Sequence, residues 1–230
     1  MFFPERITGI KDGDRVLEIG PGADPHPRSD VLLEMAFDDP VEYAKQFGHN
    51  RPLATQKELV FYDGITFPFA DKAFDYVICS QVLEHVPDVE GFTAEVFRVG
   101  RRGYFEYPLA YYEYLYNFDV HLNFVKYSNG ALNYMRKSDS HLDEFRPIQE
   151  FFHKTLTQGH TKTIEDLTVH FMEGFQWDAP FAVARTLKLI DVCTGSADVP
   201  LRTDRQLYTY GPKRLLKEFF RSLARRGEYQ

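Results

Sequence analysis

The stretch Arg15-Val16-Leu17-Glu18-Ile19-Gly20-Pro21-Gly22-Ala23-Asp24 decides the fold of this chain. Its apolar residues predict a short buried strand over 16–19, and the glycines predict a turn in which the backbone comes close to a ligand. Because glycine has no side chain, the N–H groups of such a turn can reach the ligand directly. Glu18 lies at the carboxyl end of the strand, where open α/β sheets bind ligands. Its carboxylate suits a ligand with a cation or hydroxyl groups better than one with a pyrophosphate.

The glycine turn and a second stretch together resemble a known family. Glu18-x-Gly20-x-Gly22 resembles the first motif of the class I S-adenosylmethionine-dependent methyltransferases. The sequence FPFADKAFDYVICSQVLEHV at residues 67–86 is similar to the fourth-strand region of the family's ubiquinone-biosynthesis-like, or type 11-like, branch. The two motifs stand in the family's order and spacing. A nicotinamide-binding site would instead need Gly-x-Gly-x-x-Gly, and Pro25 stands at the third glycine position.

Length, charge and cysteine content narrow the class of protein. The 230 residues suffice for one large α/β domain, which we expect to span residues 1–210. A formal net charge of −7 argues against a nucleic-acid partner, since that partner would normally need a basic face. No signal peptide or membrane span is apparent, and Cys79 and Cys193 form no disulfide framework. A cytoplasmic protein is therefore expected.

Apolar runs predict further parallel strands at 31–34, 58–62, 74–80 and 102–108, with helices at 39–48 and 89–99. Only about eight residues join the first two strands, fewer than a parallel crossover normally needs. The family's first helix is therefore expected to be shortened or missing. The resemblance implies a Rossmann-like, doubly wound seven-stranded sheet, mostly parallel with an antiparallel last strand. Residues 168–177 and 181–186 are the expected last two strands.

Tyrosines are concentrated after the fifth strand. Seven of the fourteen lie between Tyr107 and Tyr134, and clean periodicity is lost until about Gly159. We interpret residues 108–165 as an insertion, part helix and part loop, that covers the substrate. Tyrosines suit a sugar or aromatic acceptor, but they suit an ordinary core equally well.

The resemblance implies a set of cofactor-binding residues. These are Glu18, Gly20, Gly22, Glu34, Asp63 and, by their position after the fourth strand, Ser80 or Gln81. Glu34 would bind both ribose hydroxyls, because a carboxylate offers two acceptors to a vicinal diol. Asp63 would accept from the adenine amino group. The alternatives are a surface glutamate for Glu34 and a turn aspartate for Asp63.

Two histidines are the candidate catalytic residues. A general base is needed only if the methyl acceptor is a hydroxyl or a protonated amine. His85 follows Gln81 and Glu84 at helical spacing, and His121 lies in the aromatic insertion. The spacing resembles a Glu-x-x-Glu-His pattern with which some relatives hold a divalent metal. Gln81 is a weaker neutral ligand at its first position, so no metal ligand is expected. Structural roles for both histidines stay open.

The resemblance implies methyl transfer to an oxygen or nitrogen acceptor, with S-adenosylmethionine as cofactor and S-adenosylhomocysteine as product. A glycan or lipid-linked acceptor is the first expectation, with a small molecule second. The alternative is a catalytically inactive methyltransferase fold that serves as a binding or scaffold subunit.

Residues 211–230 predict a basic amphipathic helix, with an apolar stripe and cations between 213 and 226. It could lie on an anionic membrane. It could instead dock on the protein's own sheet or on a second subunit of a homodimer. The docking interpretation is favoured because the helix is short.

Overall fold

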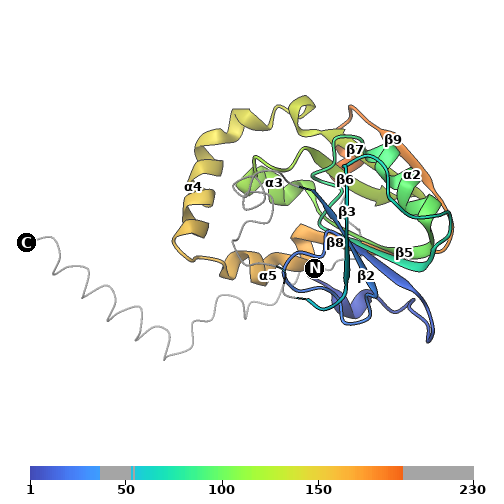
Figure 1. Cartoon of the computed structure of the whole chain (residues 1–230). Helices are drawn as coiled ribbons and strands as arrows, with labels where there is room; N and C mark the ends of the chain where they lie inside the picture. Colours follow the sequence, from blue (N-terminus) through green and yellow to red (C-terminus); the bar gives the residue numbers. More distant parts are fainter. Residues whose placement is uncertain (37–52, 54, 194–230) are drawn as a thin grey trace, which may run out of the picture. The chain divides into compact units, whose positions relative to one another are not determined.

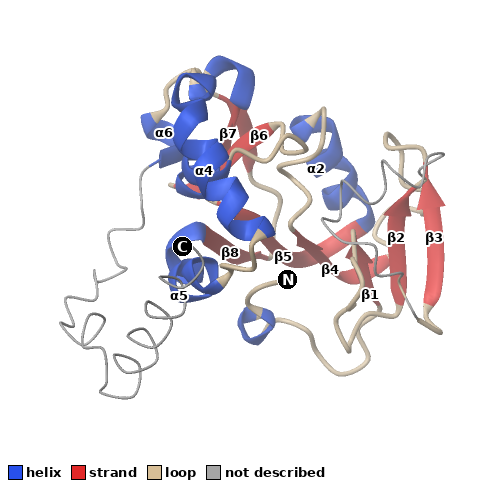
Figure 2. Ribbon diagram, turned by 90° about the vertical axis from the view of Figure 1, so that its left-hand side faces the viewer, coloured by secondary structure: helices blue, strands red, loops and turns tan. Residues whose placement is uncertain are grey.

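The computed structural model describes residues 1–36, 53 and 55–193, and these residues contain two sheets (Figures 1 and 2). The described part of the central sheet has six strands in the order β3-β2-β1-β4-β5-β8, which lie side by side in Figure 2. Their bounds are β1 Val16–Ile19, β2 Val31–Met35, β3 Glu58–Tyr62, β4 Phe74–Ser80, β5 Gly100–Pro108 and β8 Met172–Trp177. The small sheet has the order β6-β7-β9, with bounds β6 Asn123–Ser128, β7 Ala131–Arg136 and β9 Ala182–Arg185.

The central sheet is parallel except at one edge. β1 to β5 pair in parallel, and β8 runs antiparallel to β5. All four residues of β1 are buried, as expected for a strand covered on both faces. The predicted fold class, a Rossmann-like and mostly parallel sheet with an antiparallel last strand, is confirmed.

The strand order reverses direction at β1. From β1 the chain proceeds to β2 and β3 on one side, and then returns to β4 and β5 on the other. Ile19 at the end of β1 pairs with Leu33 in β2 and with Cys79 in β4, so the carboxyl ends of these three strands lie together. Open α/β sheets bind ligands in the crevice at such a switch point.

The connection from β1 to β2 contains turns and no helix over residues 20–30, which confirms the expected loss of the first helix. Two side chains hold this connection. Glu18 accepts hydrogen bonds from the backbone N–H of His26 and from Ser29 Oγ. Lys57 Nζ donates to the carbonyl oxygens of His26, Pro27 and Ser29 at 2.8, 3.0 and 2.6 Å. These hydrogen bonds fix the conformation of a connection that contains no helix.

The expected count of seven strands in the central sheet is wrong for the described residues, which supply six. Residues 182–185 do form a strand, but β9 pairs in parallel with β7 of the small sheet. Its residues are exposed or half-buried, so it lacks the apolar faces of a central strand. Residues 168–171 are helical, because Phe171 is buried with Ile164 and Leu167 beside it on one apolar stripe of α5 (Lys162–Phe171).

The segment between β5 and β8 contains more regular structure than expected. It begins with α3 (Ala110–Tyr116) and continues into the β6–β7 hairpin. Asn129 and Gly130 turn the hairpin with φ angles of +52° and +77°, which Asn-Gly pairs adopt readily. The remaining elements here are η2 Lys137–Asp139, η3 Leu142–Phe145, α4 Arg146–Thr157 and α5. Figure 1 shows α3, α4 and α5 gathered away from α2.

One face of the central sheet is covered by α2 (Val89–Val99), which begins at Asp88, whose side chain accepts from the backbone N–H of Gly91. Phe92, Val96 and Val99 of α2 join the main core. The N-terminal segment, which includes η1 (Pro4–Arg6), packs Ile7 and Ile10 against the opposite face. The short α6 (Ile190–Cys193) is the last described element.

The predicted helix at 39–48 and the predicted tail helix at 211–230 both lie outside the described residues. Among the helices that the structure does describe, none is long and apolar enough to cross a membrane.

Candidate functional site

A cavity of about 560 Å³ opens at the carboxyl ends of β1, β2 and β4. It has a β2–β3 side and a second side formed by the loop after β4 and the α3–β6 segment. The first side includes Gly20, Gly22, Glu34, Met35, Tyr62 and Gly64, and the second includes Ser80, Gln81, Glu84, His85, Tyr112, Phe118, Val120, His121 and Leu122. The volume is in the range of small-molecule and cofactor sites.

The two glycines of the turn play different parts. Both have positive φ angles, +62° at Gly20 and +60° at Gly22, which favour glycine. A Cβ at Gly20 would lie 2.6 Å from Val82 Cγ2, so this position requires glycine for packing. A Cβ at Gly22 would meet no atom of the described residues within 4 Å. Gly22 therefore leaves open the space in which a ligand can approach the backbone.

Glu18 lies behind the glycine turn and does not line the cavity. Its carboxylate accepts from the His26 backbone N–H at 2.8 Å and from Ser29 Oγ at 2.6 Å. Burial raises the pKa of Glu18, although these hydrogen bonds act in the opposite direction. Glu18 thus shapes the loop that follows the turn and would act on a ligand through it.

Glu34 is the penultimate residue of β2, and it lines the cavity. One of its oxygens accepts from the Met35 N–H at 2.8 Å. Burial raises the pKa of Glu34 to about 7. A carboxylate in this position can accept two hydrogen bonds from a diol.

Asp63 is exposed, and its Oδ1 accepts from the backbone N–H groups of Ile65 and Thr66, both at 2.9 Å. These hydrogen bonds form a turn, the structural alternative that the sequence left open. The neighbouring Gly64 lines the cavity and Asp63 does not.

Ser80 and Gln81 both line the cavity, and both are tied to Glu106, which sequence reasoning did not identify. Glu106 is buried in β5, where Oε1 accepts from Ser80 Oγ at 2.7 Å and from Gln81 Nε2 at 3.4 Å. The N–H groups of Phe2 and Phe3 also donate to it, at 2.7 and 2.9 Å. The sequence signal that could have identified Glu106 is a single carboxylate among the buried aromatic residues of β5.

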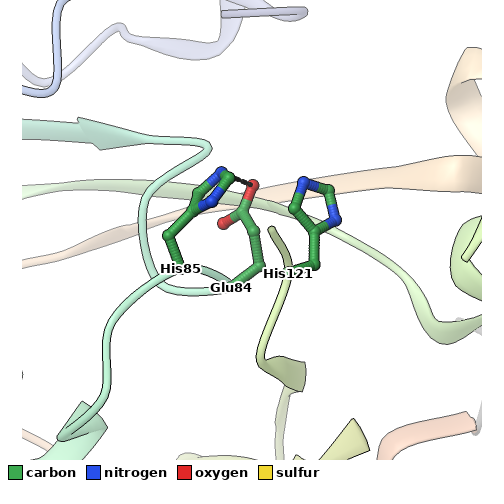
Figure 3. Close-up of side chains that lie close together, drawn as sticks. All are labelled: Glu84, His85 and His121. Atoms are coloured by element: carbon green, nitrogen blue, oxygen red, sulfur yellow. Dashed lines mark ion pairs between the residues drawn. The ribbon is translucent and has the colours of Figure 1, made fainter. Parts of the chain in front are cut away.

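The structure brings His85 and His121 together across the cavity wall. Their ring centroids lie 4.6 Å apart in an edge-to-face arrangement. Figure 3 shows the carboxyl group of Glu84 between the two imidazoles. His85 Nδ1 lies 3.1 Å from the Val120 carbonyl oxygen, and burial lowers the pKa of His85 to about 3, so the ring is neutral.

His121 is held by a buried acidic residue that sequence reasoning did not identify. Its Nδ1 lies 2.5 Å from Glu113 Oε1, while Lys137 Nζ donates to Glu113 Oε2 at 2.7 Å. Although burial acts to raise it, the hydrogen bonds from His121 and Lys137 hold the pKa of Glu113 below its usual value. The carboxylate–imidazole pair gives His121 a fixed orientation toward the cavity.

The described residues form a Rossmann-like sheet with a cavity at its switch point. A family model described as a methyltransferase domain matches residues 35–105. This match agrees with the resemblance to the class I S-adenosylmethionine-dependent methyltransferases that the motifs predicted, and proteins of that family use S-adenosylmethionine as their cofactor.

Individual proteins are similar to parts of this chain. The sterol 24-C-methyltransferases of Aspergillus fumigatus and Schizosaccharomyces pombe are each 31% identical over 102 residues, which is 41% of this chain and 27% of each relative. The chain thus spans about a quarter of the length of these relatives. An S-adenosylmethionine-dependent methyltransferase structure from Aquifex aeolicus is 18% identical, covering 46% of this chain and 63% of its own, with a TM-score of 0.32.

Proposed function

We propose that this chain is an S-adenosylmethionine-dependent methyltransferase. One observation carries the proposal: a single cavity joins the glycine turn and Glu34 to the pair His85 and His121. The first two groups suit an adenosine cofactor, and the histidines suit a reacting acceptor.

The cofactor is proposed to lie on the β2–β3 side of the cavity. Glu34 accepts from the two ribose hydroxyls, and the backbone at Gly20 and Gly22 approaches the amino-acid portion of the cofactor. Tyr62 and Gly64, at the end of β3, flank the base. Glu18 supports this arrangement by fixing the loop after the turn. Asp63 supports the site indirectly, because its carboxylate fixes the turn that contains Gly64.

Methyl transfer needs alignment above all. The acceptor's lone pair forms a bond to the methyl carbon, the bond from that carbon to the sulfonium sulfur breaks, and sulfur keeps the electron pair. The acceptor loses a proton if it begins as a hydroxyl or an ammonium group. Holding the two molecules in line therefore supplies much of the rate.

The acceptor is proposed to lie beside His85 and His121, among Tyr112, Phe118 and Leu122 of the segment after β5. Of the two histidines, His121 is the better proton acceptor, because Glu113 would stabilise its imidazolium. His85 then orients the acceptor. An oxygen or nitrogen acceptor uses such a base. The acceptor is a glycan, a lipid-linked molecule or a small molecule, whereas the fungal relatives are named for methylation of a sterol at carbon.

Calorimetric titration with S-adenosylmethionine and S-adenosylhomocysteine tests the proposal. We expect one equivalent of either molecule to bind and NAD to show no binding. A matched pair of variants then tests the acceptor side. His121→Asn should lower methyl transfer at least a hundredfold. His153→Asn should not, since the His153 ring lies against the Tyr116 carbonyl and outside the cavity. Absence of cofactor binding, or tight NAD binding, would refute the proposal.

A second candidate is an inactive fold that binds the cofactor as a scaffold subunit. Glu18 and Asp63 support this candidate, because their carboxylates hold loops through hydrogen bonds. An inactive protein would keep both residues for that structural role. Cofactor binding without formation of S-adenosylhomocysteine from any copurifying acceptor would favour the scaffold.

A further inference from the structure

Three potential metal ligands converge where the loop after β4 meets the α3–β6 connection. Glu84 and His85 come from the loop, and His121 comes from the connection (Figure 3). One carboxylate oxygen and one nitrogen from each imidazole all lie within 4.8 Å of one another. All three residues line the cavity.

The Glu84 carboxyl group is buried and lacks a hydrogen-bond partner among the described residues. Its side chain is 1% exposed, and neither oxygen has a hydrogen-bond partner among the described residues. The closest charged or chargeable group recorded for it is His85 Nε2, at 3.8 Å from Oε1, which is too long for a hydrogen bond. Buried carboxylates are normally paired or bound to a metal. A cation bound beside Glu84 would give this buried carboxylate the partner that it lacks among the described residues.

Each histidine makes its recorded contact through Nδ1, which leaves Nε2 as the nitrogen available to a ligand. His85 Nδ1 faces the Val120 carbonyl, which can only accept, so Nδ1 carries the proton and Nε2 the lone pair. His121 Nδ1 faces Glu113 in the same manner. Lys137 also donates to Glu113, so this carboxylate is held by two partners, and Nε2 is the nitrogen that His121 can offer to a cation. Histidines that bind metals are oriented by such acceptors on the other nitrogen.

We propose that Glu84, His85 and His121 bind one divalent transition-metal ion of the zinc type at the acceptor side of the cavity. Two imidazoles and one carboxylate suit zinc, cobalt or manganese better than magnesium or calcium, which prefer oxygen ligands. The prediction from sequence that no metal is bound considered only the motif at residues 81–85, in which Gln81 is a poor ligand. It did not include His121, which the fold delivers from the segment after β5.

The ligand atoms must move closer together to hold an ion. Zinc binds nitrogen and oxygen at about 2.0–2.2 Å, so its ligand atoms lie closer to one another than the 4.8 Å seen here. Rotation of the three side chains about their χ angles would have to provide this closure. Three protein ligands then leave a coordination position for a molecule in the cavity.

The role of the ion rests on the proposed function, although its binding does not. An acceptor hydroxyl bound to the metal has a lowered pKa and loses its proton to solvent. Its oxygen would then form a bond to the cofactor methyl carbon as the bond from that carbon to the sulfonium sulfur breaks and sulfur keeps the electron pair, and His121 would act as a ligand instead of a base. This assignment favours an oxygen acceptor over a nitrogen or carbon one.

Titration of the metal-stripped full chain with Zn²⁺, and with Co²⁺ followed by its visible absorption, tests the site without any cofactor. We expect one equivalent of either ion and no displacement by millimolar Mg²⁺. Glu84→Gln and His121→Asn should each weaken binding at least a hundredfold. Glu113→Gln, which among the three proposed ligands contacts His121 alone, should weaken it roughly ten- to a hundredfold. His141→Gln is the matched control, because His141 and Glu144 form an exposed histidine–carboxylate pair at 3.5 Å.

Stoichiometric binding that is lost in the cavity variants and kept in the His141→Gln control would support the site. Failure of the wild type to bind Zn²⁺ or Co²⁺ at micromolar concentrations would overturn it. Equal affinity in wild type and Glu113→Gln would also overturn it, and this variant keeps both imidazoles if Glu84→Gln fails to fold. The cofactor titration on the same preparation tests the methyltransferase proposal separately.

Discussion

Replacing Glu34 by glutamine should weaken cofactor binding and at the same time stabilise the empty protein. In the proposed complex the Glu34 carboxylate accepts from two ribose hydroxyls. Hydrogen bonds to a charged group contribute about 1.5–3 kcal/mol. Loss of about 2 kcal/mol corresponds to a roughly 30-fold rise in Kd at pH 8.

The pH dependence of cofactor binding follows from the raised pKa of Glu34, about 7 because of burial. The carboxyl is about nine-tenths ionised at pH 8 and one-tenth at pH 6, and only the ionised form accepts both hydroxyls. The wild-type Kd should therefore rise roughly tenfold between these pH values from this group alone. Glu34→Gln cannot titrate, so the ratio of variant to wild-type Kd should fall by the same factor.

The stability of the empty protein should change in the opposite direction. Burial raises the Glu34 pKa from 4.5 to about 7, so the folded chain holds this proton more tightly than the unfolded chain. Stability from this group is present below pH 4.5 and is lost as pH rises through 7. The loss amounts to at most about 3 kcal/mol. Glu34→Gln should thus melt several degrees higher than wild type at pH 8, and the difference should shrink toward pH 5.

Isothermal calorimetry with S-adenosylhomocysteine at pH 6 and 8, run on both proteins, measures the binding effects. Scanning calorimetry of the same samples without ligand measures the stability effect. Titration of the ligand's own groups affects both proteins equally, so it cancels in the ratio of variant to wild-type Kd. The reasoning fails if the variant binds as tightly as wild type at pH 8, or if the two proteins share one pH dependence.

Two further substitutions test the glycine turn and the loop behind it. Gly20→Ala should destabilise the fold markedly, since its Cβ would lie 2.6 Å from Val82 Cγ2, whereas Gly22→Ala should fold and lose cofactor affinity; equal melting temperatures for the two would contradict this. Ser29→Ala removes a 2.6 Å hydrogen bond to the buried carboxylate of Glu18 and should cost about 1–3 kcal/mol in chemical denaturation, with weaker cofactor binding; unchanged values for both would show that Glu18 does not depend on this contact.

The central sheet could be predicted because its strands are signalled locally. The runs at 16–19, 31–34 and 74–80 are mostly apolar, as buried parallel strands require, and the structure places strands there. The glycine turn was signalled equally well, because positive φ angles restrict the residue type. These features depend on nearby residues alone.

The small sheet was missed although one of its signals was present. Asn129-Gly130 between two apolar segments is a strong hairpin signal, but the surrounding tyrosines and charged residues obscured the alternation. The pairing of β9 with β7 could not be predicted, since β9 is short, mostly exposed and distant in sequence.

The contacts of the candidate site depend on tertiary structure. Nothing near Glu113 in sequence indicates that it will hold His121 and Lys137, or that Glu106 will bind Ser80 and the N-terminal backbone. The residue types could be selected from the sequence, but their partners could not. The same holds for Glu18 and Asp63, whose carboxylates the structure places in hydrogen bonds to loops.

A crystal structure of the protein with S-adenosylhomocysteine tests the central claim most directly. We predict that both ribose hydroxyls lie within about 2.5–3.0 Å of the Glu34 carboxylate. We also predict that the sulfur faces the space beside His85 and His121. Adenosine bound elsewhere on the chain, or a ribose held by other groups with Glu34 turned away, would contradict the account.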